Sequence, residues 1–275
     1  MSHDNGCNRA ARKLRCVAMR LPDDPLRLAG VTRLSLAGGR GPAEAFVFDP
    51  HRLALPAWAL ALGNRPPALL ITLDRHFDLV PPADPAAVPD RASGLRAIDE
   101  HARWALAVRN TDHVIAAMEA GLVDDVLAIA RTSPRGAVED ERWIDRRGGT
   151  HRIFRARTVD RLAADWGTAA ATPEAQAIAE RIAAGAPVIL DVDLDCFTTA
   201  SDADPTAILP WPRELVREFL LPPGSEAFWD AVLGGCVALT LAREPYHCGG
   251  LAGGARLFLD VAEVLFRELL RVDVP

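Results

Sequence analysis

Two short clusters of acidic and histidine residues in this chain have the types and spacing of metal ligands. They are Asp74-x-His76-x-Asp78, after the apolar run ALLITL, and Asp191-x-Asp193-x-Asp195, after the apolar run VIL. In an extended backbone, residues two apart point to the same side, so each cluster would present its polar side chains together. If the two clusters faced each other, at least four carboxylates and an imidazole would meet. That much negative charge in a partly dry site is costly unless a cation neutralises it.

The donor types indicate which cation this would be. Carboxylate oxygens dominate and one or two imidazoles accompany them, which suits Mn²⁺ better than Zn²⁺ or copper. The number of donors favours two ions bridged by carboxylates. Cys196, Cys236 and Cys248 form no C-x-x-C pair. We therefore interpret them as small buried hydrophobes rather than zinc ligands.

Neighbouring polar residues have structural alternatives. An aspartate that follows a strand often caps a helix or a turn, and we favour that reading for Asp49. Asp195 is equally compatible with a ligand of this cluster and with a supporting role, as a capping residue or as a residue behind the ligands. His51 by itself fits a metal ligand and a structural histidine equally well.

The elements that would position these residues alternate between short apolar runs and longer amphipathic stretches, which is typical of an α/β protein with a mostly parallel sheet. We expect strands at 44–48, 68–73, 126–130, 188–190 and 237–242, and helices at 53–62, 93–108 with Ser93 as N-cap, 112–120, 173–184 and 255–270. Site-type residues follow four of the five strands, where ligands of open parallel sheets bind. No second core is recognisable, so we expect a single domain over residues 1–275.

Composition limits the partners. The chain is 49% hydrophobic and 25% charged, as in an ordinary globular protein, and its net charge is −6, so no overall field attracts nucleic acid or an anionic membrane. Its five cysteines, which include Cys7 and Cys16, are odd in number and scattered, and the first twenty residues lack the apolar stretch of a secretory signal. We expect a cytoplasmic protein without a membrane span, and a homo-oligomer stays open.

The three strand ends, with His51, DxHxD and DxD in that order, resemble the ureohydrolase (arginase) superfamily. LDVDLDCF and REPYHCGG look closer still to a divergent branch, the uncharacterised protein family 0489, which includes peptide arginases. The resemblance covers about residues 44–270. It implies a three-layer arginase/deacetylase-like fold and a two-Mn²⁺ cluster that hydrolyses arginine within peptides to ornithine and urea.

The resemblance also implies roles for individual residues. One metal ion would be held by His51, Asp74, Asp78 and Asp191, and the other by Asp74, His76, Asp191 and Asp193. Glu244 would receive the substrate guanidinium in a bidentate pair. Tyr246 and His247 would line the substrate site, and Asp78 would relay a proton to the leaving amine. His113, His101 and His247 are candidates for a proton shuttle to solvent.

The chain departs from arginases in ways that bear on the substrate. Asp49-Pro50-His51 stands where arginases have GGDH, and no loop matches those that grip the α-carboxylate and α-amine of free arginine. We therefore expect the substrate to be a peptidyl or otherwise modified arginine.

Two alternative functions stay open. One is a zinc deacylase on the related fold, in which Tyr246 would polarise the acyl carbonyl, although a tandem His-His base is absent. The other is a metal-stabilised protein without catalytic activity.

Overall fold

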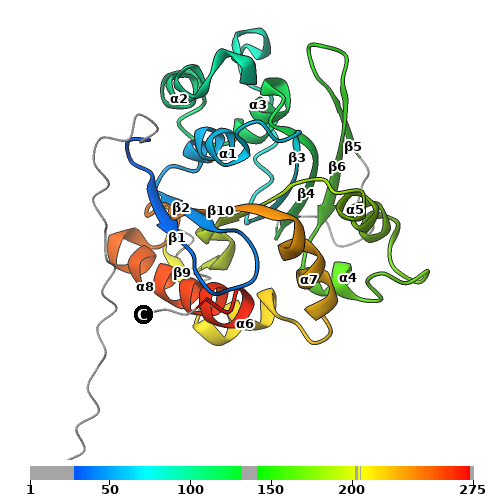
Figure 1. Cartoon of the computed structure of the whole chain (residues 1–275). Coiled ribbons are helices and arrows are strands. Elements are labelled where there is room, and N and C mark those ends of the chain that lie inside the picture. The colour runs from blue at the N-terminus through cyan, green and yellow to red at the C-terminus, as the bar shows by residue number, and fades with distance from the viewer. Residues whose placement is uncertain (1–27, 132–140, 202–203, 205, 273–275) are drawn as a thin grey trace, which may run out of the picture.

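The computed structural model describes residues 28–131, 141–201, 204 and 206–272, and its centre is an eight-stranded sheet (Figure 1). In spatial order the strands are β1 (Thr32–Ser35), β2 (Glu44–Phe48), β10 (Cys236–Ala242), β7 (Val188–Asp193), β3 (Ala68–Asp74), β4 (Val123–Ala130), β6 (Thr150–Ala156) and β5 (Glu141–Ile144). Neighbours from β2 across to β6 pair in parallel, whereas the two edge strands β1 and β5 pair antiparallel. The predicted α/β architecture with a mostly parallel sheet is confirmed.

Helices cover both faces of the sheet and make three layers (Figure 1). One face carries α1 (Ala54–Leu62), α2 (Leu95–Trp104) and α3 (His113–Ala120). The other carries α4 (Val159–Ala163), α5 (Pro173–Ala183), α6 (Arg213–Leu220), α7 (Glu226–Gly235) and α8 (Gly250–Ala262), which continues into a π-helical segment, Glu263–Leu269.

Strand β3 shows why the central strands are apolar on both sides. Leu69, Ile71 and Leu73 belong to the core under α4–α8, whereas Ala68 and Leu70 belong to the core under α1–α3. Successive side chains of a strand point to opposite faces, so a strand between two helical layers must be apolar at every position. A polar residue on such a strand, such as Asp191 on β7, is therefore exceptional.

The order of the strands places a crevice at the middle of the sheet. From β3 the chain steps outward to β4 and β6, whereas from β7 it steps the opposite way to β10. The direction thus reverses between β3 and β7. Ligands of open parallel sheets bind outside the carboxyl ends of the strands at such a reversal.

All five predicted strands are present, and four have different bounds. Strand β7 runs through Asp193, so Asp191 and Asp193 belong to the strand instead of following it. The predicted helix 93–108 is too long at both ends: α2 begins at Leu95 after Gly94, which has φ +87°, and ends at Trp104, and Ser93 does not cap it. The predicted helix 255–270 begins five residues earlier, at Gly250.

Several elements were not predicted. They are β1, β5, β6, α4, α6, α7, the short helical turns at His51–Leu53, Pro85–Ala87, Arg91–Ser93 and Leu194–Phe197, and a small hairpin of β8 (Thr198–Ala200) and β9 (Ile208–Pro210). Strand β6 has the sequence THRIFRA, in which arginine and histidine interrupt the apolar run. Because polar residues interrupt its apolar run, a strand near the edge of the sheet is not predicted from continuous hydrophobicity.

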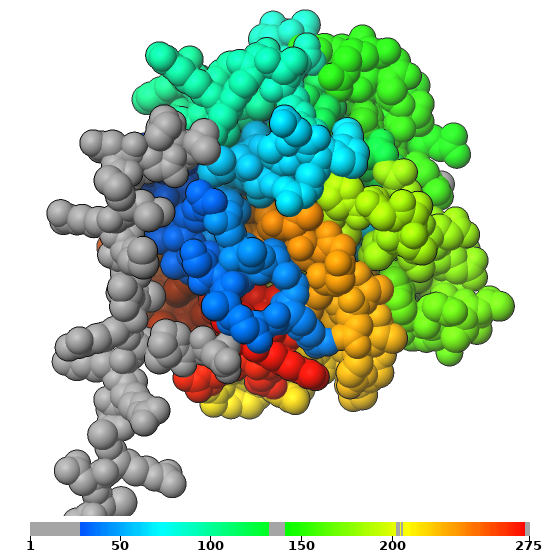
Figure 2. Space-filling view, in the orientation of Figure 1, coloured from blue at the N-terminus to red at the C-terminus, as the bar shows by residue number. Residues whose placement is uncertain are grey.

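The loop between β1 and β2 lies against the C-terminal segment of the described chain, and the blue and red surfaces adjoin in Figure 2. The backbone N–H of Arg40 donates to the carbonyl of Leu270 at 2.8 Å, and Arg40 Nε donates to the carbonyl of Leu269 at 2.8 Å.

Cys196, Cys236 and Cys248 are buried free thiols, as predicted. The first twenty residues, with Cys7 and Cys16, lie outside the described residues. Among those described, no helix combines the length and hydrophobicity that crossing a bilayer requires.

Candidate metal centre

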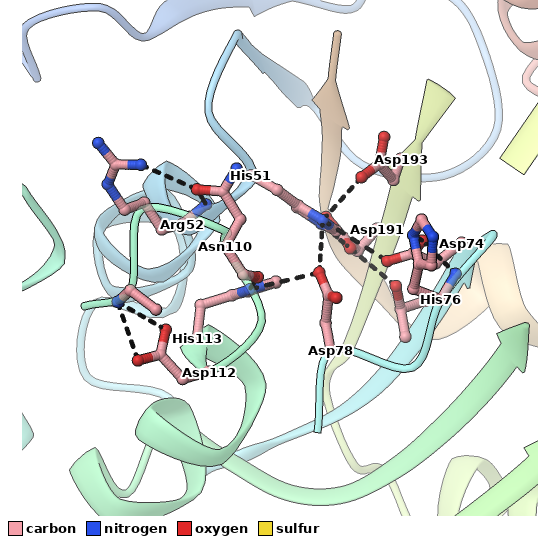
Figure 3. Close-up of polar contacts among 12 residues, drawn as sticks. His51, Arg52, Asp74, His76, Asp78, Asn110, Asp112, His113, Asp191 and Asp193 are labelled. Atoms are coloured by element: carbon pink, nitrogen blue, oxygen red, sulfur yellow. Dashed lines mark hydrogen bonds and ion pairs between the residues drawn. The ribbon is translucent and has the colours of Figure 1, made fainter. Parts of the chain in front are cut away.

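Four adjacent strands bring their carboxyl ends together at one edge of the sheet, in the order β2, β10, β7 and β3. His51 follows β2, Glu244 follows β10, Asp193 ends β7 and Asp74 ends β3. Figure 3 shows the side chains of His51, Asp193, Asp191, Asp78 and Asp74 gathered there, with His76 beside Asp74. The two predicted clusters do face each other.

Asp74 and Asp193 have the same local geometry. Oδ1 of Asp74 accepts the backbone N–H of His76 at 2.8 Å, and Oδ1 of Asp193 accepts the backbone N–H of Asp195 at 3.0 Å. Each bond closes a turn in which an aspartate side chain binds the backbone two residues later. The other oxygen of each carboxylate, Oδ2, remains for a further partner.

That further partner is a common point beside His51, which is fully buried. His51 Nδ1 lies 3.1 Å from Asp193 Oδ2, 3.3 Å from Asp78 Oδ2 and 3.7 Å from Asp74 Oδ2, yet it has no hydrogen-bond partner. A buried nitrogen without a hydrogen bond among three carboxylate oxygens is the donor set that a divalent cation requires.

A second group of donors lies next to the first. His76 Nδ1 lies 3.1 Å from Asp195 Oδ2 and 3.8 Å from Asp74 Oδ1, and these three side chains form another candidate ligand group. Asp195 is buried, and its Oδ1 accepts the backbone N–H of Arg75 at 3.2 Å. Asp74 belongs to both groups and Asp193 lies close to Asp195, so the two groups adjoin.

Asp191 has different partners from those that the resemblance implies. Its Oδ1 accepts a hydrogen bond from the hydroxyl of Thr240 at 2.5 Å. Its Oδ2 accepts a hydrogen bond from the hydroxyl of Thr72 at 2.9 Å and also lies 2.8 Å from Nε2 of His51. Thr72 and Thr240 are the residues paired with Asp191 on the two neighbouring strands. Among the described residues, Asp191 belongs to none of the candidate ligand groups.

Asp191 therefore orients the ring of His51. Its carboxylate accepts the proton on Nε2 of His51 and so leaves the lone pair on Nδ1, the nitrogen that faces the other carboxylates. Thr240 is held in turn by Trp58 of α1, whose Nε1 donates to Thr240 Oγ1 at 3.1 Å. This buried chain of hydrogen bonds fixes the His51 ring from behind.

The electrostatics of the site reflect crowded negative charge. Burial, followed by the charges of neighbouring aspartates, raises the pKa of Asp74 and of Asp193 well above the usual range. Burial alone lowers the pKa of His51, but Asp191 and Asp193 raise it well above its ordinary value. Burial also opposes the ionisation of Asp195, yet the hydrogen bond from His76 lowers the pKa of Asp195. A bound cation would relieve this repulsion.

The DxHxD segment does not continue as an extended strand, in contrast to the prediction. The chain bends after Asp74, Asp78 has a positive φ of +50°, and Phe77 packs under the guanidinium of Arg155 at 4.3 Å. The side chain of His76 is half exposed. Asp78 reaches His51 because of this bend and not through strand periodicity.

His113, a predicted catalytic residue, lies under His51 rather than at the surface. It is fully buried, its ring centroid is 4.2 Å from that of His51, and its Nδ1 lies 2.8 Å from the carbonyl oxygen of Asn110. Burial, reinforced by the charge of His51, lowers the pKa of His113 to about 4. At neutral pH it is therefore an uncharged ring that supports His51.

Glu244 stands at the mouth of the site, close to both ligand groups. It is 8% exposed, and one of its carboxylate oxygens lies within 4.8 Å of ligand oxygens of Asp193 and Asp195. Glu244 Oε1 accepts the backbone N–H of His51 at 3.1 Å and the side-chain amide of Asn110. Burial raises the pKa of Glu244.

Tyr246 and His247, which come after Pro245, point outward. Tyr246 is 93% exposed, so its hydroxyl does not face the candidate ligands. The side chain of His247 is 57% exposed, its Nε2 lies 3.9 Å from Glu244 Oε2, and its ring centroid is 6.5 Å from that of His76. His247 thus connects the mouth of the site with solvent.

Sequence reasoning missed the supporting residues Thr72, Thr240 and Asn110, and left open whether Asp195 is a ligand or a supporting residue. Thr72 and Thr240 are polar residues inside buried apolar strands, and that anomaly was available as a signal. Asn110 carried no signal, because its role depends on a loop conformation. No protein-family model and no curated protein matches this chain.

Proposed function

We propose that the protein is a manganese-dependent ureohydrolase with an arginase-like fold, and that it hydrolyses peptidyl arginine to peptidyl ornithine and urea. The observation that carries the proposal is the position of Glu244. An oxygen of this buried carboxylate lies within 4.8 Å of oxygens of Asp193 and Asp195, one acid from each candidate ligand group, at the mouth of a site whose other acids are the proposed ligands. Such a carboxylate suits a cationic guanidinium next to a metal-activated nucleophile.

The geometry favours a ligand set shifted by two residues from the one that the resemblance implies. One ion would be held by His51 Nδ1, Asp74, Asp78 and Asp193, and the second by Asp74, His76, Asp193 and Asp195. Asp195 replaces Asp191, whose oxygens are engaged by Thr72, Thr240 and His51. Asp74 and Asp193 would then belong to both ligand sets.

The donor set of oxygen atoms with two imidazoles supports Mn²⁺ as the cation. When bound, the two ions would lower the pKa of water sufficiently to supply hydroxide near neutral pH. The remaining chemistry belongs to side chains of the protein.

Glu244 would orient the guanidinium over the ligand groups, and its charge would compensate that of the substrate. The leaving amine needs a proton. Asp78, 9% exposed at its side chain, is available to deliver it inside the site. His247 connects Glu244 with solvent and is therefore better placed than the buried His113 to exchange protons with the bulk.

A peptidyl substrate is favoured by what the sequence lacks. The loops that hold the α-carboxylate and α-amine of free arginine in arginases have no counterpart in this chain, and Asp49-Pro50-His51 replaces their GGDH. A substrate whose α-groups are in peptide bonds does not need such loops.

The deacylase alternative depends on Tyr246 facing the metal. The 93% exposure of Tyr246 gives that alternative no support. A metal-binding protein without activity would show bound manganese and no product in the experiment that follows.

The test is incubation of the purified full-length protein with Mn²⁺ and arginine-containing peptides, in parallel with free arginine. Mass spectrometry should show a loss of about 42 Da, the CN₂H₂ difference between arginine and ornithine, from the peptides, with an equimolar release of urea. The control is the Asp193→Ala variant, which lacks a ligand that the proposal assigns to both ions. A loss from free arginine alone would contradict the peptide substrate, and no urea from any guanidinium compound would contradict ureohydrolysis.

A further inference from the structure

Asn110 lies in the turn between α2 and α3, directly against Glu244. It is 8% exposed and has a left-handed backbone, with φ +59°. Asparagine tolerates this conformation better than most residues. Its side-chain amide is buried between Arg52 on one side and Glu244 on the other.

The two neighbours determine which way the amide faces. Asn110 Oδ1 lies 3.0 Å from Nη1 of Arg52 and 3.4 Å from the backbone N–H of Arg52. An arginine side chain offers only donors, so the oxygen of the amide must face it. Asn110 Nδ2 therefore faces Glu244 and donates to its Oε1.

The two oxygens of Glu244 differ as a result. Oε1 receives two N–H groups, from Asn110 Nδ2 and from the backbone of His51 at 3.1 Å, which fills both of its lone pairs. Oε2 lies 3.9 Å from His247 Nε2, beyond hydrogen-bond distance. The carboxylate thus has one occupied oxygen and one oxygen that remains available.

We propose that Asn110 is a positioning residue for substrate recognition: it anchors Oε1 of Glu244 and reserves Oε2 as the acceptor for a guanidinium N–H. The inference deepens the proposed function and rests on it. It replaces the bidentate pairing expected from the sequence with recognition through one oxygen, because a fork-to-fork pair would need both.

Backbone strain at the site agrees with this role. Asp78, Asn110 and Glu244 account for three of the five non-glycine residues with positive φ in the described part of the chain, and Glu244 has φ +34°. Such conformations persist only where surrounding contacts over-determine them. The bonds from Asn110 and His51 to Oε1, and the bond from the Glu244 backbone N–H to the carbonyl of Asp49 at 3.2 Å, provide those contacts.

The experiment compares Glu244→Gln with Glu244→Ala. In Glu244→Gln, the donors of Asn110 and His51 would hold the amide oxygen, so the NH₂ group would face the guanidinium and donor would meet donor. We expect methylguanidinium to bind to the Mn²⁺-loaded Gln variant at least about threefold more weakly than to the Ala variant, measured by calorimetry. If the Gln variant binds methylguanidinium as well as or better than the Ala variant, Asn110 does not orient residue 244 and the inference is overturned.

Asn110→Gly provides the second arm, because glycine accepts the positive φ without strain. In this background the Gln side chain loses one of its two fixed donors, so the deficit of Glu244→Gln relative to Glu244→Ala should shrink or reverse. Asn110→Gly alone should raise KM for the peptide about tenfold or more with bound manganese unchanged. An unchanged KM in this variant would contradict the proposal.

Crystal structures of the wild type and of Asn110→Gly separate this inference from the proposed function. The carboxylate of Glu244 should leave its wild-type position in the variant. An unmoved carboxylate would overturn the positioning role even if the wild type hydrolyses peptides. Conversely, a wild type that neither binds methylguanidinium nor releases urea would overturn the proposed function and the assignment of Oε2 to a guanidinium. In that case, a displaced Glu244 carboxylate in Asn110→Gly would still support the anchoring of Oε1.

Discussion

Asp74 and Asp193 are held in the same way at the ends of neighbouring strands: each binds the backbone N–H two residues later through Oδ1 and directs Oδ2 toward His51 Nδ1. The residues two positions further on, His76 and Asp195, also meet, at 3.1 Å. Asp74-x-His76 at the end of β3 and Asp193-x-Asp195 at the end of β7 are therefore equivalent halves of one site. This equivalence supports a proposed ligand pair at the end of β7 that lies two residues later than the pair implied by the resemblance to arginases.

The first prediction follows from this pairing. The wild type should bind two equivalents of Mn²⁺ and Asp195→Asn only one, because the neutral amide is a poor substitute for a carboxylate beside His76. Metal analysis after gel filtration measures the stoichiometry. Asp124→Asn, on the same sheet but outside the ligand groups, is the control and should retain both ions. Two ions retained by the Asp195 variant would contradict the shifted ligand set.

Asp191 should behave as a supporting residue rather than a ligand. We expect Asp191→Asn to weaken manganese binding by about 10–100-fold, because a neutral amide holds the His51 ring less firmly than a charged carboxylate does. Both ions should still bind at saturating metal. Titration with Mn²⁺ measures the affinities and the final stoichiometry. Thr240→Val, which removes one donor to Asp191 and preserves the shape of the side chain, should give a smaller effect in the same direction. A loss of one ion at saturation would restore Asp191 to the ligand set.

The metal-free protein should lose stability as the pH rises. Asp74 and Asp193 have raised pKa values in the folded state, so above the ordinary aspartate value of 3.8 the unfolded chain releases these protons more readily than the folded chain does. His51 also has a raised pKa, and its contribution is complete below 6.5 and lost as the pH rises through the folded value. Both effects have the same sign.

In EDTA, the contribution of these groups should therefore lower Tm as the pH rises from about 5 to about 8. Mn²⁺ should raise Tm most at the upper end of this range, because metal and protons compete for the same atoms. Asp193→Asn should flatten the pH dependence without metal. A metal-induced rise in Tm that is equal at pH 5 and pH 8 would contradict the competition.

The sequence was sufficient for the five adjacent strands β2, β10, β7, β3 and β4, and for most of the polar residues that meet at their carboxyl ends. Apolar runs such as 68–73 must lie between two layers, and the polar residues that follow them must meet at the carboxyl edge. The register within β7 was not predictable, because Asp191, Asp193 and Asp195 have the same two-residue spacing and only the end of the strand distinguishes them. The bend after Asp74 and the orientation of Asn110 depend on positive φ values, which the sequence pattern does not encode.

His247 and His113 should differ in a way that identifies the proton route. His247 is half exposed beside Glu244, so a shuttle at that position can exchange with solvent, and His247→Ala should lower kcat about tenfold or more with KM changed much less. Added imidazole should restore part of the lost rate, because the ring would diffuse into an open position.

His113 is buried and uncharged at neutral pH, since its pKa is about 4, and it packs against His51 and Trp58. His113→Ala should lower Tm and manganese affinity, and imidazole should not restore its rate, because no open path leads to the vacated position. Rescue of the His113 variant but not of the His247 variant would assign the shuttle to the buried ring and would require an opening movement of α3.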